Sequence, residues 1–132
     1  MAHELPRMTL ALENINAYYG ESHILRNVSF TIEPGEVVCL MGRNGMGKTT
    51  TLKTLTGLLP ARSGTITFDG RDITQERTDL RAKRGLAYVP QGREIIPHLT
   101  VHQNLLLGYW NRPSLTGDVS EREAFDEVYH LF

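Results

Sequence analysis

Apolar and polar side chains alternate in three stretches of the sequence. In residues 9–19 and again in 28–32, aliphatic and aromatic residues are separated by polar ones, and this period of two predicts half-buried β-strands. Residues 65–68 repeat the pattern, and Asp69-Gly70 directly after them is a strong signal for a tight hairpin turn. The first part of the chain is therefore predicted to contain an antiparallel sheet.

Two other runs are apolar without alternation. Residues 36–41 and 86–89 are typical of buried parallel strands, which are covered on both faces of the sheet. Cys39 lies in the first run, and because it is the single cysteine of the sequence it cannot form an intrachain disulfide. We expect it to pack in the core.

Helical patterns follow these strands. Residues 48–55 place two leucines at helical spacing before Gly57, and residues 74–84 are polar, helix-compatible and followed by Gly85. From Thr100 onward, Val101 and the leucines at 105–107 predict a short helix that ends near Gly108. Strands that alternate with helices predict an α/β fold.

The last part of the sequence predicts one more helix after a loop at 113–118. Residues 120–123, which read Ser-Glu-Arg-Glu, form a capping box. The amphipathic pattern that follows is made by Phe125, Val128 and Leu131. Because the chain ends at Phe132 inside this expected helix, with no C-cap, we interpret the sequence as truncated.

Composition narrows the class of protein. The 132 residues suffice for one domain, 40% of them are apolar and 22% charged, and the net charge is −1. Nucleic-acid binding is not expected, because such proteins usually carry a basic face. No signal peptide is visible and no apolar run approaches the roughly 20 residues of a membrane-spanning helix, so a cytoplasmic protein is predicted. The five histidines have no metal-ligand spacing.

One stretch carries chemistry of its own. Residues 42–49 fit the template G-x-x-x-x-G-K-[S/T] at every fixed position, and they are Gly42, Arg43, Asn44, Gly45, Met46, Gly47, Lys48 and Thr49. Glycines let backbone N–H groups turn inward around phosphate oxygens. Lys48 supplies a positive charge for the outer phosphates and Thr49 a hydroxyl for Mg²⁺. The alternative is a glycine turn that binds no ligand.

A glutamine follows the second apolar run. Gln91 stands just beyond the predicted strand 86–89 and its Pro90 stop, and ligands bind at the carboxyl ends of strands in open α/β sheets. Gln91 is therefore a candidate site residue, although a glutamine at this position is more often an ordinary loop residue.

These motifs, in their order, resemble the ATP-binding subunit of an ABC transporter over essentially the whole chain. The resemblance is carried by Tyr18-Tyr19-Gly20, the 42–49 motif, residues 63–66, Asp69-Gly70 and residues 88–91. The sequence of residues 92–101 is similar to the corresponding sequence of subunits that serve branched-chain amino-acid and urea uptake in bacteria.

The resemblance implies a fold and a domain organisation. The fold is a P-loop nucleoside triphosphate hydrolase core with an antiparallel β subdomain and the start of an α-helical subdomain. Residues 1–132 would be one truncated ATP-binding domain, with the core and β subdomain at 9–92 and the helical part at 93–132.

The resemblance also implies roles for single residues. Tyr19 would stack on adenine, and Tyr18 is the alternative; base–aromatic stacking is worth roughly 1–3 kcal/mol in nucleic-acid binders. Residues 42–48 would hold the phosphates, with Thr49 as the Mg²⁺ ligand and Thr50 as a further phosphate contact. Gln91 would reach Mg²⁺ and the attacking water, so the catalytic residues would be Lys48 and Gln91.

The function implied is ATP hydrolysis that drives solute import, with ATP and Mg²⁺ as cofactors. The partners would be transmembrane permease subunits, a second ATP-binding subunit and, indirectly, a solute-binding protein, on the cytoplasmic face of the bacterial inner membrane. One departure is Gln103, which stands where the family commonly has glutamate.

Three family motifs are absent from these residues. They are an LSGGQ-like signature, a second apolar run ending in Asp-Glu, and the switch histidine; His98 and His102 are poor substitutes, because no motif ties them to the γ-phosphate. A nucleotide-binding fragment without turnover is therefore one alternative function. Another is a non-transport P-loop protein, either a small-molecule kinase or an ABC-type ATPase of DNA repair, the latter disfavoured by the charge.

Overall fold

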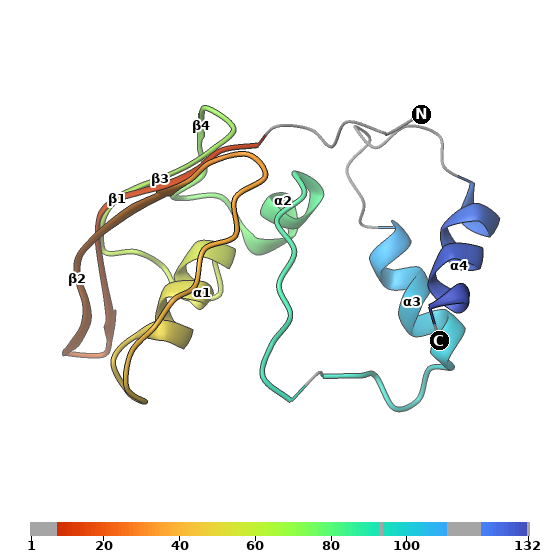
Figure 1. Ribbon diagram of the computed structural model, residues 1–132. Helices are drawn as coiled ribbons and strands as arrows, with labels where there is room; N and C mark the ends of the chain where they lie inside the picture. Colours follow the sequence, from red (N-terminus) through yellow and green to blue (C-terminus); the bar gives the residue numbers. More distant parts are fainter. Residues whose placement is uncertain (1–7, 93, 111–119, 132) are drawn as a thin grey trace. The chain divides into compact units, whose positions relative to one another are not determined.

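The computed structural model describes residues 8–92, 94–110 and 120–131. The chain forms two compact units, residues 1–81 and 82–132 (Figure 1), and the boundary between them falls inside helix α2 (Thr78–Lys83). The division predicted at residues 92 and 93 stays a prediction. Among the residues described, no helix is long and apolar enough to cross a membrane.

The first unit contains the antiparallel sheet that the alternating stretches predict. Strand β1 (Leu10–Tyr19) lies between β2 (Ser22–Ile32) and β3 (Ser63–Phe68), and β4 (Arg71–Asp72) pairs with β3 at the edge. All pairs are antiparallel. The three predicted strands are thus confirmed, and β2 begins earlier than its alternating part because it pairs with β1 up to the hairpin turn.

The predicted turn at Asp69-Gly70 is also confirmed. Both residues have positive φ, 49° at Asp69 and 73° at Gly70, as required at the central positions of a type I′ turn. This backbone conformation matches the twist of the two strands that it joins. The local sequence was therefore sufficient to place the β3–β4 hairpin.

Helix α1 (Lys48–Thr56) lies beside the sheet (Figure 1) and ends at Gly57, whose φ is 83°. Its buried side is rich in threonine. The Thr51 and Thr54 hydroxyls are satisfied within the helix, because they donate their protons to the carbonyl oxygens of Gly47 and Thr50, each at 2.8 Å. Such bonds leave the threonine methyl groups free to pack. The apolar core of this unit comprises Leu12, Ile15, Ala17, Leu25, Leu55, Ile66, Phe68 and Ile73.

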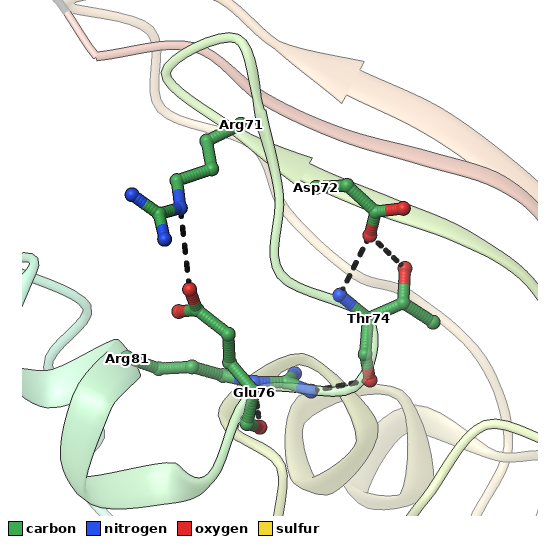
Figure 2. Close-up of polar contacts among 5 residues, drawn as sticks. All are labelled: Arg71, Asp72, Thr74, Glu76 and Arg81. Atoms are coloured by element: carbon green, nitrogen blue, oxygen red, sulfur yellow. Dashed lines mark hydrogen bonds and ion pairs between the residues drawn. The ribbon is translucent and has the colours of Figure 1, made fainter.

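A buried arginine holds the C-terminal end of α1. Arg81 is 3% exposed, and one of its terminal nitrogens donates to the carbonyl oxygens of Thr54 at 3.0 Å and Leu55 at 2.6 Å. Its other groups donate to the carbonyl oxygens of Thr74 and Glu76 (Figure 2). A cation at this end of a helix satisfies unpaired carbonyls and complements the helix dipole. Burial lowers the pKa of Arg81, and the Glu76 carboxylate opposes that shift.

Thr74 connects this arginine to the sheet. The Thr74 hydroxyl accepts from the backbone N–H of Ile66 in β3 at 2.8 Å, while its own N–H and hydroxyl donate to the Asp72 carboxylate (Figure 2). These two bonds lower the pKa of Asp72. The edge of the sheet, the segment after β4 and the end of α1 therefore form one hydrogen-bonded network.

The second unit contains α3 (Val101–Trp110) and α4 (Glu121–His130). The capping box at Ser120 and Glu123 is confirmed, and its bonds lower the pKa of Glu123. Gln103 forms the equivalent box in α3, since its side-chain oxygen accepts from Thr100 N–H at 2.9 Å while its own N–H donates to the Thr100 hydroxyl. A neutral glutamine thus performs this capping role.

Several predicted helix ends were wrong. α3 continues two residues beyond Gly108, and α2 is shorter than the predicted 74–84. Helix α4 ends before the chain does, with Leu131 as its C-cap donating to the Val128 carbonyl. Its apolar face is partly covered, because Phe125 is buried and contacts the rings of His102 and Tyr109 from α3. The predicted loop at 113–118 lies outside the described residues.

The two predicted parallel strands are not formed. Residues 36–41 and 86–89 belong to no sheet, Val37 and Val89 are 95% and 84% exposed, and Cys39 is exposed rather than packed in a core. An apolar run becomes a strand only when another strand supplies the hydrogen-bonding ladder. No described strand pairs with either run, which is why this prediction was wrong.

Replacing Arg81 tests whether it stabilises the first unit. Arg81→Met keeps the volume but leaves buried carbonyl groups without donors, so the free energy of unfolding should fall by about 3–5 kcal/mol. The matched control is Arg77→Met, because Arg77 is exposed and its ion pair with Asp79 is exposed too; a change below about 1 kcal/mol is expected there. Urea denaturation of both variants measures the difference, and equal losses would contradict the assignment.

Candidate nucleotide-binding site

The loop before α1 is shaped by glycines with left-handed backbone. Gly45 and Gly47 have φ of 82° and 97°, a region that side chains with a Cβ rarely adopt. The Met46 N–H donates to the Arg43 carbonyl at 3.2 Å, which closes a turn within residues 42–48, here named the 42–48 loop. The left-handed backbone of the loop therefore explains why glycine stands at positions 45 and 47.

The N-terminal end of α1 has unpaired donors. The Thr51 N–H donates to the Gly47 carbonyl at 2.8 Å, so the N–H groups of Lys48, Thr49 and Thr50 come before the first turn's hydrogen bond and have no acceptor within the helix. Gly47 is the N-cap and provides no side-chain cap. Free N–H groups and the positive end of the helix dipole together suit an anion with several oxygens.

The Lys48 side chain folds back over the same loop. Its ammonium donates to the Gly42 carbonyl and, at 2.9 Å, to the Arg43 carbonyl. These bonds fix the charge beside the loop although the side chain is only half-buried. The arrangement brings a full positive charge and the free N–H groups of α1 to one place, where they can bind phosphate oxygens.

The 42–48 loop packs directly on the β1–β2 hairpin. A Cβ built on Gly47 would lie 2.9 Å from a Leu25 methyl carbon and 3.7 Å from a methyl carbon of Ile24. Ile24 is the extra residue of a β-bulge, because Ala17 pairs with Leu25 and the next pair is Tyr18 with His23. The end of the hairpin is therefore anchored on the start of α1.

The two candidate tyrosines differ in their surroundings. Tyr19 is the last residue of β1 and is 47% exposed. Tyr18 is half-buried, its ring is stacked on His23, and the Arg62 guanidinium lies over it. Tyr18 therefore has no uncovered ring face, whereas Tyr19 has ring surface that a planar base could cover.

The three threonines of the first turn also differ. Thr49 is exposed, as a metal-binding hydroxyl must be, while Thr50 is buried. The Thr51 hydroxyl is buried and donates to the Gly47 carbonyl, so its proton is already used within the helix. Of the three, Thr49 is the most accessible from solvent.

Gln91 belongs to the second unit, where it is exposed in the turn after residues 86–89. The structure brings residues 42–50 and the β1–β2 hairpin together, and the assignment of Gln91 to the same site stays a prediction. Asp126 and Glu127 form an Asp-Glu pair, but they lie exposed on helix α4, where Asp126 pairs with Arg122. Among the described residues, no group of three metal-ligating side chains was found.

Sequence reasoning missed four residues around the site: His23, Ile24, Leu25 and Arg62. Hairpin register could have found the first, because a two-residue turn after Tyr19 places His23 opposite Tyr18. The apolar pair at 24–25 carries no signal that it contacts a glycine more than twenty residues later. Arg62 is even farther from Tyr18 along the chain.

Comparison with known proteins identifies the class. Residues 25–131 match the family described as ABC transporter, and this range contains the 42–48 loop and α1. The chain therefore belongs to the ABC transporter family. ATP-binding cassettes are the members of this family that it resembles in structure.

Three curated relatives show how the match is distributed. The chain is 40% identical over 101 residues to the ribose import ATP-binding protein RbsA of Oceanobacillus iheyensis, covering 76% of this chain and 20% of RbsA. It is 37% identical over 123 residues to the high-affinity branched-chain amino acid transport ATP-binding protein BraG of Pseudomonas aeruginosa, covering 93% and 51%. It is 35% identical over 125 residues to the lipopolysaccharide export system ATP-binding protein LptB of Escherichia coli, covering 93% and 52%. The chain thus spans about half the length of BraG and LptB.

A solved structure supports the fold. An ATP-binding cassette of an ABC transporter superimposes with a TM-score of 0.68 at 35% identity, covering 77% of this chain and 40% of that one. The predicted class, an α/β P-loop ATPase fold with an antiparallel β subdomain, is thereby confirmed, although the described residues form only the antiparallel sheet and helices.

The contact between Gly47 and the hairpin can be tested with two matched glycines. Gly47→Ala places a methyl group in left-handed backbone and against Leu25, while Gly45→Ala has the same backbone strain and nothing within 4 Å. We expect Gly45→Ala to lower the free energy of unfolding by about 1–2 kcal/mol and Gly47→Ala by a further 1–3 kcal/mol. Denaturant titration measures both, and equal effects would contradict the packing described.

Proposed function

We propose that this chain is the nucleotide-binding part of an ATP-binding subunit that powers transport of a solute by ATP hydrolysis. The observation that supports it most is the N-terminal end of α1, where three free backbone N–H groups and the Lys48 ammonium converge on the 42–48 loop. Membership of the ABC transporter family makes ATP the expected nucleotide.

In this proposal residues 42–48 hold the phosphates. The backbone N–H groups donate to phosphate oxygens, and the Lys48 ammonium exchanges its loop carbonyl partners for the outer phosphates. Thr50 makes a further contact from the first turn of α1. The exposed Thr49 hydroxyl binds Mg²⁺, which when bound neutralises phosphate charge and orients the transferred group.

The adenine is assigned to Tyr19. Its exposed ring stands at the end of a hairpin whose neighbouring residues contact Gly47, so base and phosphates can be bound by adjacent parts of the first unit. The covered faces of Tyr18 support Tyr19 over its neighbour. Stacking is tolerant of the base, since every base has a π-face.

Hydrolysis is proposed for the whole protein. Gln91 is assigned to Mg²⁺ and the attacking water, and Lys48 to charge stabilisation during phosphoryl transfer. The second candidate function is nucleotide binding without turnover by these 132 residues alone. It is favoured by one observation: the only Asp-Glu pair of the sequence lies exposed on a helix rather than at a strand end. This pair is therefore not placed to act as the general base, a group that typically contributes ~10²–10⁴ in rate.

The partners proposed are transmembrane permease subunits and a second ATP-binding subunit, on the cytoplasmic face of the bacterial inner membrane, with a solute-binding protein acting indirectly. BraG, named for branched-chain amino acid transport, supports amino-acid import, whereas LptB, named for export, matches the same share of the chain. The proposal of urea as the transported solute rests on the sequence of residues 92–101 alone. Uptake of labelled leucine or urea by membrane vesicles that contain the complete transporter distinguishes these solutes.

Lys48→Ala tests the nucleotide site. Removing charge-assisted hydrogen bonds worth about 1.5–3 kcal/mol should weaken MgATP binding by roughly 10–100-fold. Lys53→Ala is the matched control, because Lys53 carries the same charge in the last turn of the same helix. The MgATP affinity of this variant should change less than twofold. Isothermal titration calorimetry measures both dissociation constants, and unchanged affinity in Lys48→Ala would refute the site assignment.

A further inference from the structure

The Tyr18 ring is enclosed by two side chains. The centroids of the Tyr18 and His23 rings lie 4.2 Å apart and their planes are inclined by 8°. The guanidinium carbon of Arg62 lies 4.0 Å from the same Tyr18 centroid. Two groups this close to one ring cannot share a face, so the imidazole and the guanidinium cover opposite faces. Tyr18, His23 and Arg62 are here named the Tyr18 cluster.

The Tyr18 cluster joins three segments of the sheet. Tyr18 is in the central strand β1, its cross-strand partner His23 is in β2, and Arg62 lies just before β3 on the other side of β1. The Arg62 N–H donates to the Asn16 carbonyl at 2.8 Å, which holds this segment against β1. Side chains from the segments on both sides of β1 therefore contact the Tyr18 ring.

Asn16 fixes the orientation of the imidazole. Its Oδ1 accepts from the Asn27 backbone N–H at 3.1 Å, which identifies that atom as the oxygen. His23 Nε2 lies 2.9 Å from the same Oδ1, so Nε2 carries a proton and donates. The His23 ring is thus held both by stacking and by a directed hydrogen bond.

The cluster stands between the two halves of the proposed nucleotide site. Tyr19 follows Tyr18 directly at the end of β1, and on the other strand His23 is followed by the bulge residue Ile24 and then by Leu25, which packs against Gly47. A shift of Tyr18 would therefore move the Tyr19 ring relative to the start of α1. The ring interactions of the cluster are among its own members, and a Cβ on Gly47 would meet Leu25 and Ile24 rather than a cluster residue.

We propose that the Tyr18 cluster positions Tyr19 and thereby sets the affinity for the base, but not for the phosphates, of the bound nucleotide. The three side chains act as positioning residues, because a preorganised aromatic surface loses less conformational freedom when the base binds. This inference rests on the proposed function, in which Tyr19 stacks on adenine.

The test compares two ligands that share the phosphate part. MgATP carries a base, whereas magnesium tripolyphosphate does not, so only the former depends on Tyr19. Arg62→Ala uncovers one face of Tyr18, and because Arg62 is exposed, the variant should fold. We expect Arg62→Ala and His23→Ala to weaken MgATP binding roughly three- to tenfold while tripolyphosphate affinity changes less than twofold. His23→Phe, which keeps the stack, should restore most of the loss.

Two controls make the result specific. Arg26→Ala removes a positive charge from the same hairpin at an exposed position outside the cluster, and both affinities should stay within twofold. Tyr19→Ala should weaken MgATP binding roughly tenfold or more and spare tripolyphosphate.

The outcomes separate the inference from the proposed function. If Tyr19→Ala weakens MgATP binding but Arg62→Ala and His23→Ala do not, the positioning role is wrong and the nucleotide site stands. If the cluster variants lose affinity for MgATP and for tripolyphosphate to the same extent, the Tyr18 cluster has a general structural role, and this result would also overturn the inference. If the wild-type chain binds neither ligand, the proposed function itself fails.

Discussion

Helix α1 is held at both ends, and the candidate site depends on this constraint. At its N-terminal end Gly47 packs against Leu25 without room for a side chain. At its C-terminal end Arg81 donates to the last carbonyl groups and ties them to the segment after β4. A helix fixed in this way presents its free N–H groups in one direction, which is the preorganisation that binding of a multiply charged anion requires.

The same constraint explains why the hairpin is part of the site. Leu25, which follows the bulge residue Ile24, packs against Gly47, so the end of the hairpin and the start of α1 are held together. A base on Tyr19 and phosphates at α1 could then be bound at a fixed separation. In the proposed site the base would be bound on the sheet and the phosphates on the helix, and Gly47 packs against Leu25 between them.

Local signals in the sequence predicted local structure well. The turn at Asp69-Gly70 and the capping box at Ser120 depend on residues close together in the chain, and both have the geometry expected. Residues 36–41 and 86–89 were predicted as strands, but a strand needs a partner for its backbone, and the described residues provide none. Likewise, the residues next to the two tyrosines do not distinguish Tyr18 from Tyr19, because the cover on Tyr18 comes partly from distant Arg62.

In the proposed site the free N–H groups at the start of α1 bind the phosphates of ATP. The most direct measurement is a ¹H–¹⁵N correlation spectrum of the 132-residue chain during titration with MgATP, with magnesium tripolyphosphate and with adenosine. We predict saturable shifts of the Lys48, Thr49 and Thr50 amides with both phosphate ligands and none with adenosine alone. Binding of MgATP that leaves these three amides unmoved would contradict this prediction.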